Sequence, residues 1–197
     1  MTKLISTFAA VLVAAGTARA ANTWGVGAAY WDTSDAADAV GAMTKFSFEM
    51  VPGAQLDLRA SYFSDLAEDV EGTDADLEVV PLELGLALAY PLGNVVDLTA
   101  GGGIGYYLMD GSVTAENRTV QQADPENEVG FYGVLGLEWS LRKSGASFGE
   151  TEAGLFFEVL YRSVSADNIQ VESGETLRLS DADLDGVGLN LGVMIKW

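Results

Sequence analysis

The chain has 197 residues, of which 49% are hydrophobic, and its 10 lysine and arginine residues face 29 aspartate and glutamate residues. This length suits one domain, and the formal net charge of −19 argues against binding to nucleic acid or to other anionic surfaces unless divalent cations intervene. The chain has no cysteine, so an exported form would be held together by packing or lipid contacts instead of disulfides.

The first twenty residues have the features of a secretory signal peptide. Lys3 supplies a basic start, residues 4–15 are mostly apolar, and Ala18-Arg19-Ala20 fits a small-residue cleavage site. The apolar run is too short to cross a bilayer as a helix; a retained anchor is the alternative. We expect a signal peptide at 1–20, one domain at 21–197, and a mature chain with eight bases, 29 acids and a formal charge of −21.

Apolar residues at every second position predict eight strands in the mature chain. Each predicted strand has one apolar face, as with Leu84, Leu86 and Leu88, and one face of small, polar or charged residues. No later run of about twenty apolar residues exists for a membrane helix, whereas about ten alternating residues suit one strand of a transmembrane barrel. The strands are predicted at residues 22–31, 43–50, 55–63, 82–90, 96–108, 128–139, 151–162 and 186–197.

The predicted connections alternate between short and long, as an up-and-down barrel requires. Short turns are expected at 51–54, around Pro52-Gly53, and at 91–95. Pro81 cannot donate to a strand ladder and is expected at the rim or in a bulge. The connection at 140–150 is longer than the other turns on its side. Long polar loops are expected at 32–42, 64–76, 109–127 and 163–183.

The last strand alternates throughout, from Val187 to Trp197, and ends on an aromatic residue. A strand of a soluble sheet is the alternative interpretation of this stretch by itself. The final eight residues nevertheless resemble the assembly signal of outer-membrane barrels. Its specified places are filled by Asn190, Gly192, Ile195 and Trp197.

Aromatic residues begin or end the predicted strands in two groups, as expected for two membrane interfaces. Trp24, Tyr90, Trp139 and Trp197 are predicted at the periplasmic rim. A soluble barrel such as a lipocalin would place apolar residues inside and polar residues outside, the inverse of the pattern expected here. The group predicted at the other rim comprises Tyr30, Phe46, Tyr62, Tyr106, Phe131 and Tyr161.

With these features the mature chain resembles the small eight-stranded outer-membrane proteins of the OmpA, OmpX and OmpW types. The resemblance rests on the signal peptide, the strand count, the glycine-rich segment 100–107 and the Trp197 terminus. It implies an all-β fold, an eight-stranded antiparallel up-and-down transmembrane β-barrel in the bacterial outer membrane. It also implies a monomer that contacts outer-membrane lipid, lipopolysaccharide and the barrel assembly machinery. It does not imply an activity, because a shared fold does not fix function.

Charged residues recur on the predicted inward faces, where a wet interior tolerates them. Eight strands leave an interior that side chains just fill, so we expect these charges to pair and brace the barrel, with a conducting pore as the alternative. Around Pro52-Gly53, Arg59 is expected diagonal to Glu49 and within ion-pair distance of an interior carboxylate. The predicted network comprises Lys45, Glu49, Asp57, Arg59, Glu83, Glu138, Glu158, Arg162 and Lys196, with Asp97 on the same face of its strand.

The residue types present argue against known barrel enzymes. Barrel hydrolases and acyltransferases that act on lipids resemble one another in using a histidine beside a serine or an acid, and this chain has no histidine. We therefore expect a protein that is not an enzyme and binds no cofactor.

Divalent cations are possible at the acidic loops. Asp181, Asp183 and Asp185 resemble the start of an EF-hand calcium loop, but the twelfth position would be Gly192 instead of a bidentate glutamate. These three residues are weak metal candidates, and a solvated loop entering a strand is the preferred interpretation. Taken together, the sequence favours a structural or surface-interaction role in membrane integrity or adhesion. A small porin-like channel for ions or small solutes is the alternative.

Overall fold

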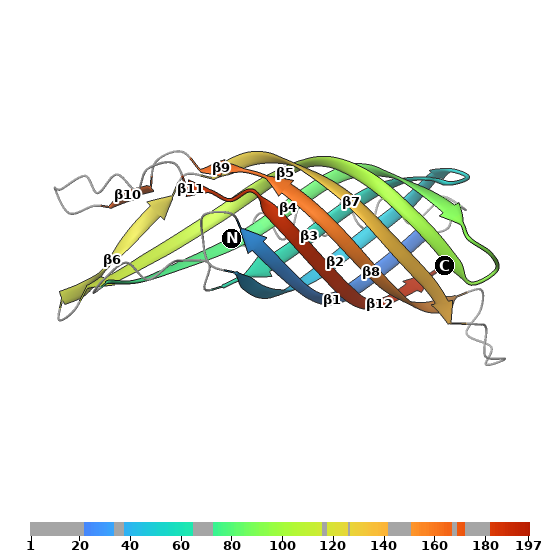
Figure 1. Ribbon diagram of the computed structural model, residues 1–197, viewed down its shortest axis with the longest axis horizontal. Helices are drawn as coiled ribbons and strands as arrows, with labels where there is room; N and C mark the ends of the chain where they lie inside the picture. The colour runs from blue at the N-terminus through green and yellow to red at the C-terminus, as the bar shows by residue number, and fades with distance from the viewer. Residues whose placement is uncertain are drawn as a thin grey trace.

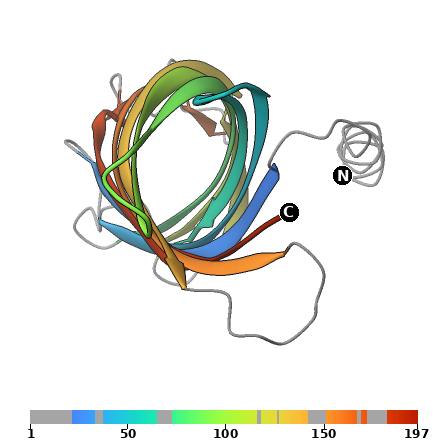
Figure 2. The same cartoon turned by 90° about the vertical axis from the view of Figure 1, so that its right-hand side faces the viewer.

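Eight antiparallel strands, each hydrogen-bonded to two neighbours, close into a barrel (Figures 1 and 2). The computed structural model describes residues 22–33, 38–64, 73–115, 118–125, 127–141, 151–166, 169–171 and 182–197. The barrel is formed by β1 (Asn22–Thr33), β2 (Ala39–Val51), β3 (Ala54–Phe63), β4 (Thr73–Pro91), β5 (Val96–Ala115), β7 (Glu128–Leu141), β8 (Glu152–Ser163) and β12 (Gly186–Lys196). The predicted all-β, eight-stranded, up-and-down antiparallel barrel is confirmed. In the described part of the chain, no helix is long and apolar enough to cross a membrane.

The period-two alternation decides which side chains line the lumen. Along β8, exposed Leu155, Phe157 and Val159 alternate with buried Phe156 and Glu158. The exposed residues point away from the barrel axis, and the buried ones fill its interior. The same alternation runs along β7 and β12, so the outer surface is apolar while the lumen holds the charged residues.

The barrel is closed by pairing between β1 and β12. Their register runs without a break from Thr23 opposite Lys196 to Thr33 opposite Gly186. Two further bonds extend it, because Asn22 N–H donates to Trp197 O at 2.8 Å and Trp197 N–H donates to Asn22 O at 3.0 Å. Closure therefore satisfies main-chain groups that an open edge would leave unpaired.

Both short turns lie at one end of the barrel, called here the turn end. The opposite end is the loop end. Gly53 in the β2–β3 turn has φ of 80°, and Gly93 in the β4–β5 turn has φ of 144°. Residues with a Cβ rarely adopt these values, so the two glycines explain why such short connections form there. The turns predicted at 51–54 and 91–95 lie where they were expected; residues 142–150 of the remaining connection lie outside the described residues.

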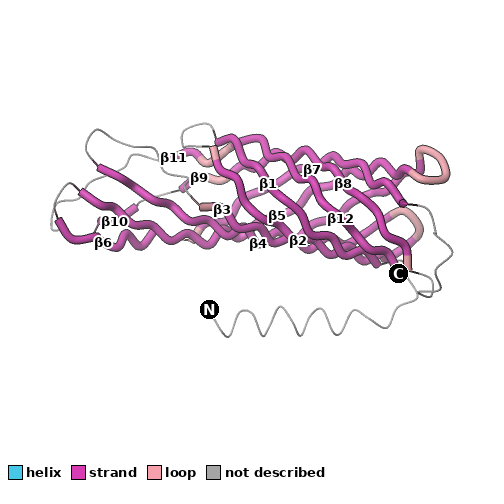
Figure 3. The backbone as a smooth tube through the Cα atoms, turned by 90° about the horizontal axis from the view of Figure 1, so that it is seen from below, coloured by secondary structure: helices cyan, strands magenta, loops and turns pink. Residues whose placement is uncertain are grey.

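The predicted loop at 109–127 is wrong in most of its length. β5 continues to Ala115, β4 already begins at Thr73 within the predicted loop 64–76, and the two strands stay paired from Thr73–Ala115 to Pro91–Asp97. β6 (Arg118–Pro125) folds back on β5. Figure 3 shows this ribbon projecting at the loop end. Two strands that bond mainly to each other need no buried face, so apolar alternation does not reveal them.

The predicted loop at 163–183 also contains short strands. β9 (Ser165–Ala166) pairs with β11 (Ala182–Asp183), and β10 (Ile169–Val171) pairs with β6. Segments of two or three residues carry no readable period, which is why the sequence did not reveal them. The first predicted loop, 32–42, is also shorter than expected, because β2 begins at Ala39.

Pro81 lies inside β4 instead of at its start. The β3–β4 ladder pairs Ala60 with Leu82 and then Phe63 with Val79, so two rungs are missing opposite Pro81 and Val80. Proline lacks the N–H that such a rung needs. The expected rim position or bulge is not found, because the β3–β4 register is the same on both sides of the gap and β4 continues to pair with β5, where Pro81 faces Tyr107.

We predict that deleting Ile195–Trp197 lowers the heat-modifiable, folded fraction of the barrel. The deletion removes the last β1–β12 rungs and both hydrogen bonds to Asn22, and each unsatisfied group in hydrocarbon costs several kcal/mol. The measurement is the shift between boiled and unboiled protein on gels after refolding.

Trp197→Phe is the control, because it keeps every main-chain bond and should fold like the unmodified chain. Unchanged folding of the deleted chain would show that this end of β12 does not contribute to closure.

Candidate functional site

The lumen contains a layer of charged side chains that is almost wholly removed from solvent. Alternation along each strand turns these residues inward, and closure of the barrel then buries them. Glu158 is 0% exposed and Lys45 and Arg59 are each 2% exposed. Charges at this depth are costly unless they are paired.

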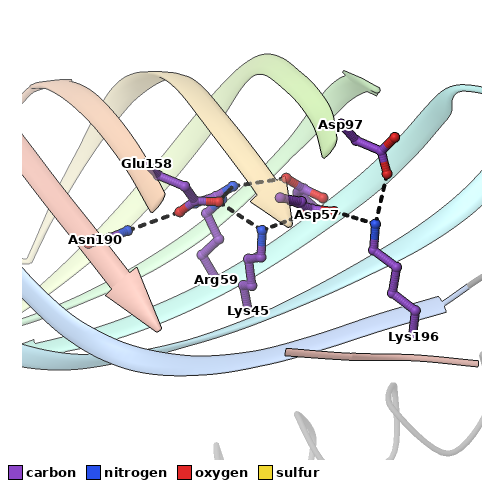
Figure 4. A network of polar contacts seen from close by, with 8 residues as sticks. Lys45, Asp57, Arg59, Asp97, Glu158, Asn190 and Lys196 are labelled. Atoms are coloured by element: carbon purple, nitrogen blue, oxygen red, sulfur yellow. Dashed lines mark hydrogen bonds and ion pairs between the residues drawn. The ribbon is translucent and has the colours of Figure 1, made fainter. Parts of the chain in front are cut away.

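Glu158 on β8 is the centre of this layer (Figure 4). Its carboxylate accepts hydrogen bonds from Lys45 Nζ at 2.9 Å, from Arg59 Nη1 at 2.6 Å and from Arg59 Nη2 at 3.0 Å. Asn190 Nδ2 donates to the same carboxylate at 3.2 Å. One carboxylate from β8 therefore joins β2 and β3 across the lumen and also bonds the neighbouring strand β12.

Further ion pairs extend this layer toward the turn end. Lys45 Nζ also lies 2.8 Å from Glu138 Oε1, and Arg59 Nη2 lies 3.0 Å from Asp57 Oδ2. Lys196 bridges Asp97 at 3.0 Å and Glu138 at 2.9 Å. The ion-pair network, as we call it, comprises Lys45, Asp57, Arg59, Asp97, Glu138, Glu158, Asn190 and Lys196. It links six of the eight barrel strands, β2, β3, β5, β7, β8 and β12.

A further ion pair, separate from the ion-pair network, lies nearer the loop end. Arg162 Nε donates to Glu83 Oε1 at 2.8 Å, and Tyr107 O–H donates to the same oxygen at 3.4 Å. The Arg162 guanidinium lies 5.0 Å from the ring centroid of Trp31 and 5.6 Å from that of Phe63. Cation–π attraction is strongest where the cation has lost its water, and Arg162 is fully buried. This pair adds β1 and β4 to the strands that are braced across the lumen.

An apolar layer closes the interior beyond Arg162. Trp31, Phe63 and Tyr107 are each 0% exposed, and the Trp31 ring lies 5.3 Å from Phe63 and 6.1 Å from Tyr107. The other members of the layer near the loop end include Val79, Met109, Val164 and Leu184. From the turn end to the loop end, the lumen thus changes from charged to apolar.

The inward glycines make room for tyrosine rings. A Cβ on Gly85 would overlap the Tyr132 hydroxyl, and one on Gly105 would come within 2.6 Å of the Tyr107 ring. On a single strand, small inward residues leave open space beside the main chain. In the barrel, large side chains from other positions occupy that space, which supports a filled interior.

The predicted interior residues are placed as follows. Lys45, Asp57, Arg59, Glu83, Glu138, Glu158 and Arg162 are buried in the lumen, and Lys196 is partly buried at the turn end. Glu49 lies beside the turn, where its Oε1 accepts the Gly53 N–H at 3.2 Å. Arg59 is not diagonal to Glu49, because the β2–β3 register places Glu49 opposite Gln55 and Arg59 opposite Lys45.

The weak metal candidates do not form a cluster in the described residues. Asp181 lies outside the described residues, and of Asp183 only the main chain, in β11, is described. The Asp185 carboxylate accepts the Val164 N–H at 2.7 Å and also contacts Ser163 and Tyr161. It is therefore occupied as a hydrogen-bond acceptor for protein groups. Among the described residues, no group of three or more potential ligands could hold a metal ion.

The aromatic residues predicted at the periplasmic rim lie at the turn end and are exposed on the outer surface. Trp24 is near the start of β1, Tyr90 and Trp139 are near the ends of β4 and β7, and Trp197 follows β12. The prediction for Phe46 is wrong, because this residue lies toward the turn end and not at the opposite rim. It pairs with Trp24, and the centroids of the two stacked rings lie 6.0 Å apart. The reason is that β2 begins at Ala39, so Phe46 lies in its second half.

The residues that resemble the assembly signal occupy both faces of β12. Asn190 points into the lumen and bonds Glu158, whereas Ile195 and Trp197 are exposed outside. A Cβ on Gly192 would overlap the main chain of β1 at Val26. Asn190 therefore contributes a hydrogen bond to the ion-pair network, which its place in the assembly signal did not reveal.

Sequence reasoning missed the aromatic layer around Arg162. Trp31 and Tyr107 occupy inward positions by the same alternation that placed the charged residues, so a signal was present. What the alternation lacks is information on which strands face each other across the lumen.

Solved structures of several outer-membrane proteins are similar to this fold. No protein-family model and no curated protein sequence matches the chain. The outer membrane protein OprG of Pseudomonas aeruginosa matches over 93% of this chain and 98% of its own, with 15% identity and a TM-score of 0.64. Ail, the attachment invasion locus protein of Yersinia pestis, matches over 91% of this chain and 100% of its own, with 10% identity and a TM-score of 0.55.

A second structure of Ail, in complex with the heparin analogue sucrose octasulfate, matches with 11% identity and a TM-score of 0.53, again over 91% of this chain and 100% of its own. The chain has the fold of the small eight-stranded outer-membrane barrels. At sequence identities of 10% to 15%, these matches show a similar fold and nothing further.

We predict that Glu158→Gln lowers the free energy of unfolding by roughly 3–5 kcal/mol, because it leaves Lys45 and Arg59 buried with less compensating charge. Urea titration of the refolded barrel in lipid vesicles measures the change. Glu78→Gln, an exposed glutamate on β4, is the matched control and should change stability by no more than about 0.5 kcal/mol. Equal effects of the two substitutions would contradict a stabilising role for the network.

Proposed function

We propose that this chain is an integral outer-membrane β-barrel with a closed lumen and a structural or surface-interaction role, in membrane integrity or adhesion. Its partners would be outer-membrane lipid, lipopolysaccharide and the barrel assembly machinery, and it would act as a monomer. Contacts with other molecules would be made at the loop end. Residues 1–20 would direct export, and the chain would catalyse no reaction.

The outer surface supports a membrane location. Large apolar side chains are exposed on all eight barrel strands, including Leu86 at 58%, Leu88 at 66% and Leu191 at 61%. Water-soluble monomers rarely expose a continuous apolar surface of this kind. The aromatic residues at the turn end fit one interface, because amphipathic rings favour the headgroup region. About ten residues of a tilted strand cross a membrane, so β4 and β5, with 19 and 20 residues, would project well beyond the loop-end interface.

The ion-pair network is the observation that carries the closed-lumen proposal. Its long cations, Lys45 and Arg59, extend from β2 and β3 to carboxylates on β7 and β8. Tyr132 and Tyr107 fill the space beside the inward glycines. An ion moving along the axis would have to displace paired charges that have lost their water, which is costly.

The negative charge of the chain limits the kinds of molecule that the loop end could bind. The mature chain would carry a formal charge of −21, and Asp32, Asp38, Glu78 and Asp110 are exposed toward that end. Ail has been crystallised with a polyanion, the heparin analogue. This chain would repel polyanions, so we infer cationic partners, or anionic lipopolysaccharide bridged by divalent cations.

A small porin-like channel is the second candidate. The partly exposed Lys196–Asp97 pair at the turn end favours it, because that mouth remains open to water. The network beyond Lys196 argues against it.

We predict that the refolded protein shows no long-lived single-channel steps in planar bilayers. The double variant Lys45→Ala, Arg59→Ala should conduct, because it removes the two cations that fill the middle of the lumen. Asp110→Asn, which changes an exposed residue, is the control and should stay silent. Reproducible steps from the unmodified protein would instead favour the porin-like channel.

We predict that Leu86→Arg destabilises the barrel in lipid by roughly 2–4 kcal/mol, the cost of a cation near the bilayer midplane. Leu92→Arg, in the exposed turn after β4, is the matched control and should cost about 0–1 kcal/mol, as near an interface. Refolding titrations into vesicles measure both. Equal tolerance at the two positions would contradict the proposed membrane orientation.

A further inference from the structure

The segments that leave β8 and enter β12 cover the lumen at the loop end. Val164 follows β8 and Leu184 precedes β12, and each is only 1% exposed within the apolar layer. Leu184 N–H donates to Val164 O at 3.0 Å. Just beyond them β9 and β11 pair antiparallel, and Figure 1 shows the two short strands side by side. The two segments thus continue the β8–β12 hairpin in the same register at the loop end.

Asp185 holds this arrangement together. Its Oδ1 accepts the Val164 N–H at 2.7 Å, and its Oδ2 accepts the Ser163 hydroxyl at 3.3 Å and the Tyr161 hydroxyl at 3.2 Å. All three donors belong to the end of β8 or to the residue after it. A carboxylate that accepts several hydrogen bonds forms stronger, charge-assisted interactions than a neutral acceptor. One side chain therefore fixes the entry to β12 against the exit from β8.

The groups beneath this cover depend on it for their dry surroundings. Trp31 packs in the same apolar layer as Val164 and Leu184, and the Arg162 guanidinium lies against the Trp31 ring. Arg162 Nη1 and Nη2 have no hydrogen-bond partner among the described residues. If Val164 and Leu184 moved away, water could reach this cation and solvate it. Opening would separate only the end of the β8–β12 hairpin, beginning at Val164 and Leu184, and the ladder from Arg162–Gly186 onward would stay intact.

We propose that Val164, Leu184 and Asp185 form a lid over the loop end of the lumen, with the Asp185 carboxylate as its clasp. The lid opens by local movement and admits water and small solutes to the Arg162 layer while the barrel stays folded. This goes beyond the proposed function, because it concerns the loop end alone and holds whether or not the ion-pair network blocks conduction.

Single cysteines test the lid, since the chain has none of its own. Leu184→Cys in the refolded barrel is treated with a water-soluble maleimide, and its labelling rate is compared with that of Asp110→Cys, an exposed position. The lid predicts slow labelling of Leu184→Cys. Adding Asp185→Ala should accelerate it by roughly tenfold or more, because charge-assisted hydrogen bonds are lost.

Two variants calibrate this result. Asp185→Asn should give an intermediate rate, because its amide oxygen can still accept the Val164 N–H. Asp32→Ala, which removes an exposed carboxylate opposite Val187, should leave the rate unchanged. If Leu184→Cys prevents folding, Val164→Cys replaces it as the reporter.

Ser47→Cys, buried near the ion-pair network, distinguishes lid opening from unfolding. Its labelling should stay slow when Asp185→Ala is added. Fast labelling of Leu184→Cys in the otherwise unmodified barrel, or no response to Asp185→Ala, would overturn the lid. Equal acceleration at Ser47→Cys would also overturn it, because the barrel would then open as a whole.

Discussion

The β1–β12 ladder makes every other feature of this molecule possible. Strands at an open sheet edge leave N–H and C=O groups without partners, at a cost of several kcal/mol for each group in hydrocarbon. Here β1 and β12 pair from Thr23–Lys196 to Thr33–Gly186, so the ladder returns to its start. Once closed, the sheet has an inside and an outside, and period-two alternation assigns each side chain to one of them.

Closure also buries charged side chains, which is costly, and brings them together as ion pairs that connect the strands. Lys45, Arg59 and Glu158 would be solvated on an isolated strand, but inside the barrel they lose water and must compensate one another. They come from positions as far apart as 113 residues, for Lys45 and Glu158. Such pairs contribute less to net stability than apolar packing of equal volume would. Their value here is to fix strands β2, β3, β7 and β8 in one arrangement and to occupy the lumen.

The barrel contains regions with different physical properties. The charged layer fills the middle of the barrel, and the apolar layer around Trp31 and Phe63 lies nearer the loop end. The outer surface carries exposed leucines and aromatic residues, as the proposed membrane location requires. At the loop end β4 and β5 extend and acidic residues are exposed. We therefore place the proposed surface-interaction role at the loop end.

The sequence by itself determined the number of barrel strands, the parity of each barrel strand and the inward position of the charged residues, because alternation is a local property. It did not determine the β2–β3 register, which places Arg59 opposite Lys45 instead of diagonal to Glu49. It also did not identify Glu158 as the partner of Arg59 across the lumen. It also missed the β4–β5 ribbon, whose pairing is set by main-chain bonds and not by apolar alternation. Only the tertiary structure decided these features. Contacts across the lumen depend on distances between strands that are remote in the chain, and the register and length of a hairpin depend on main-chain pairing that apolar alternation does not encode.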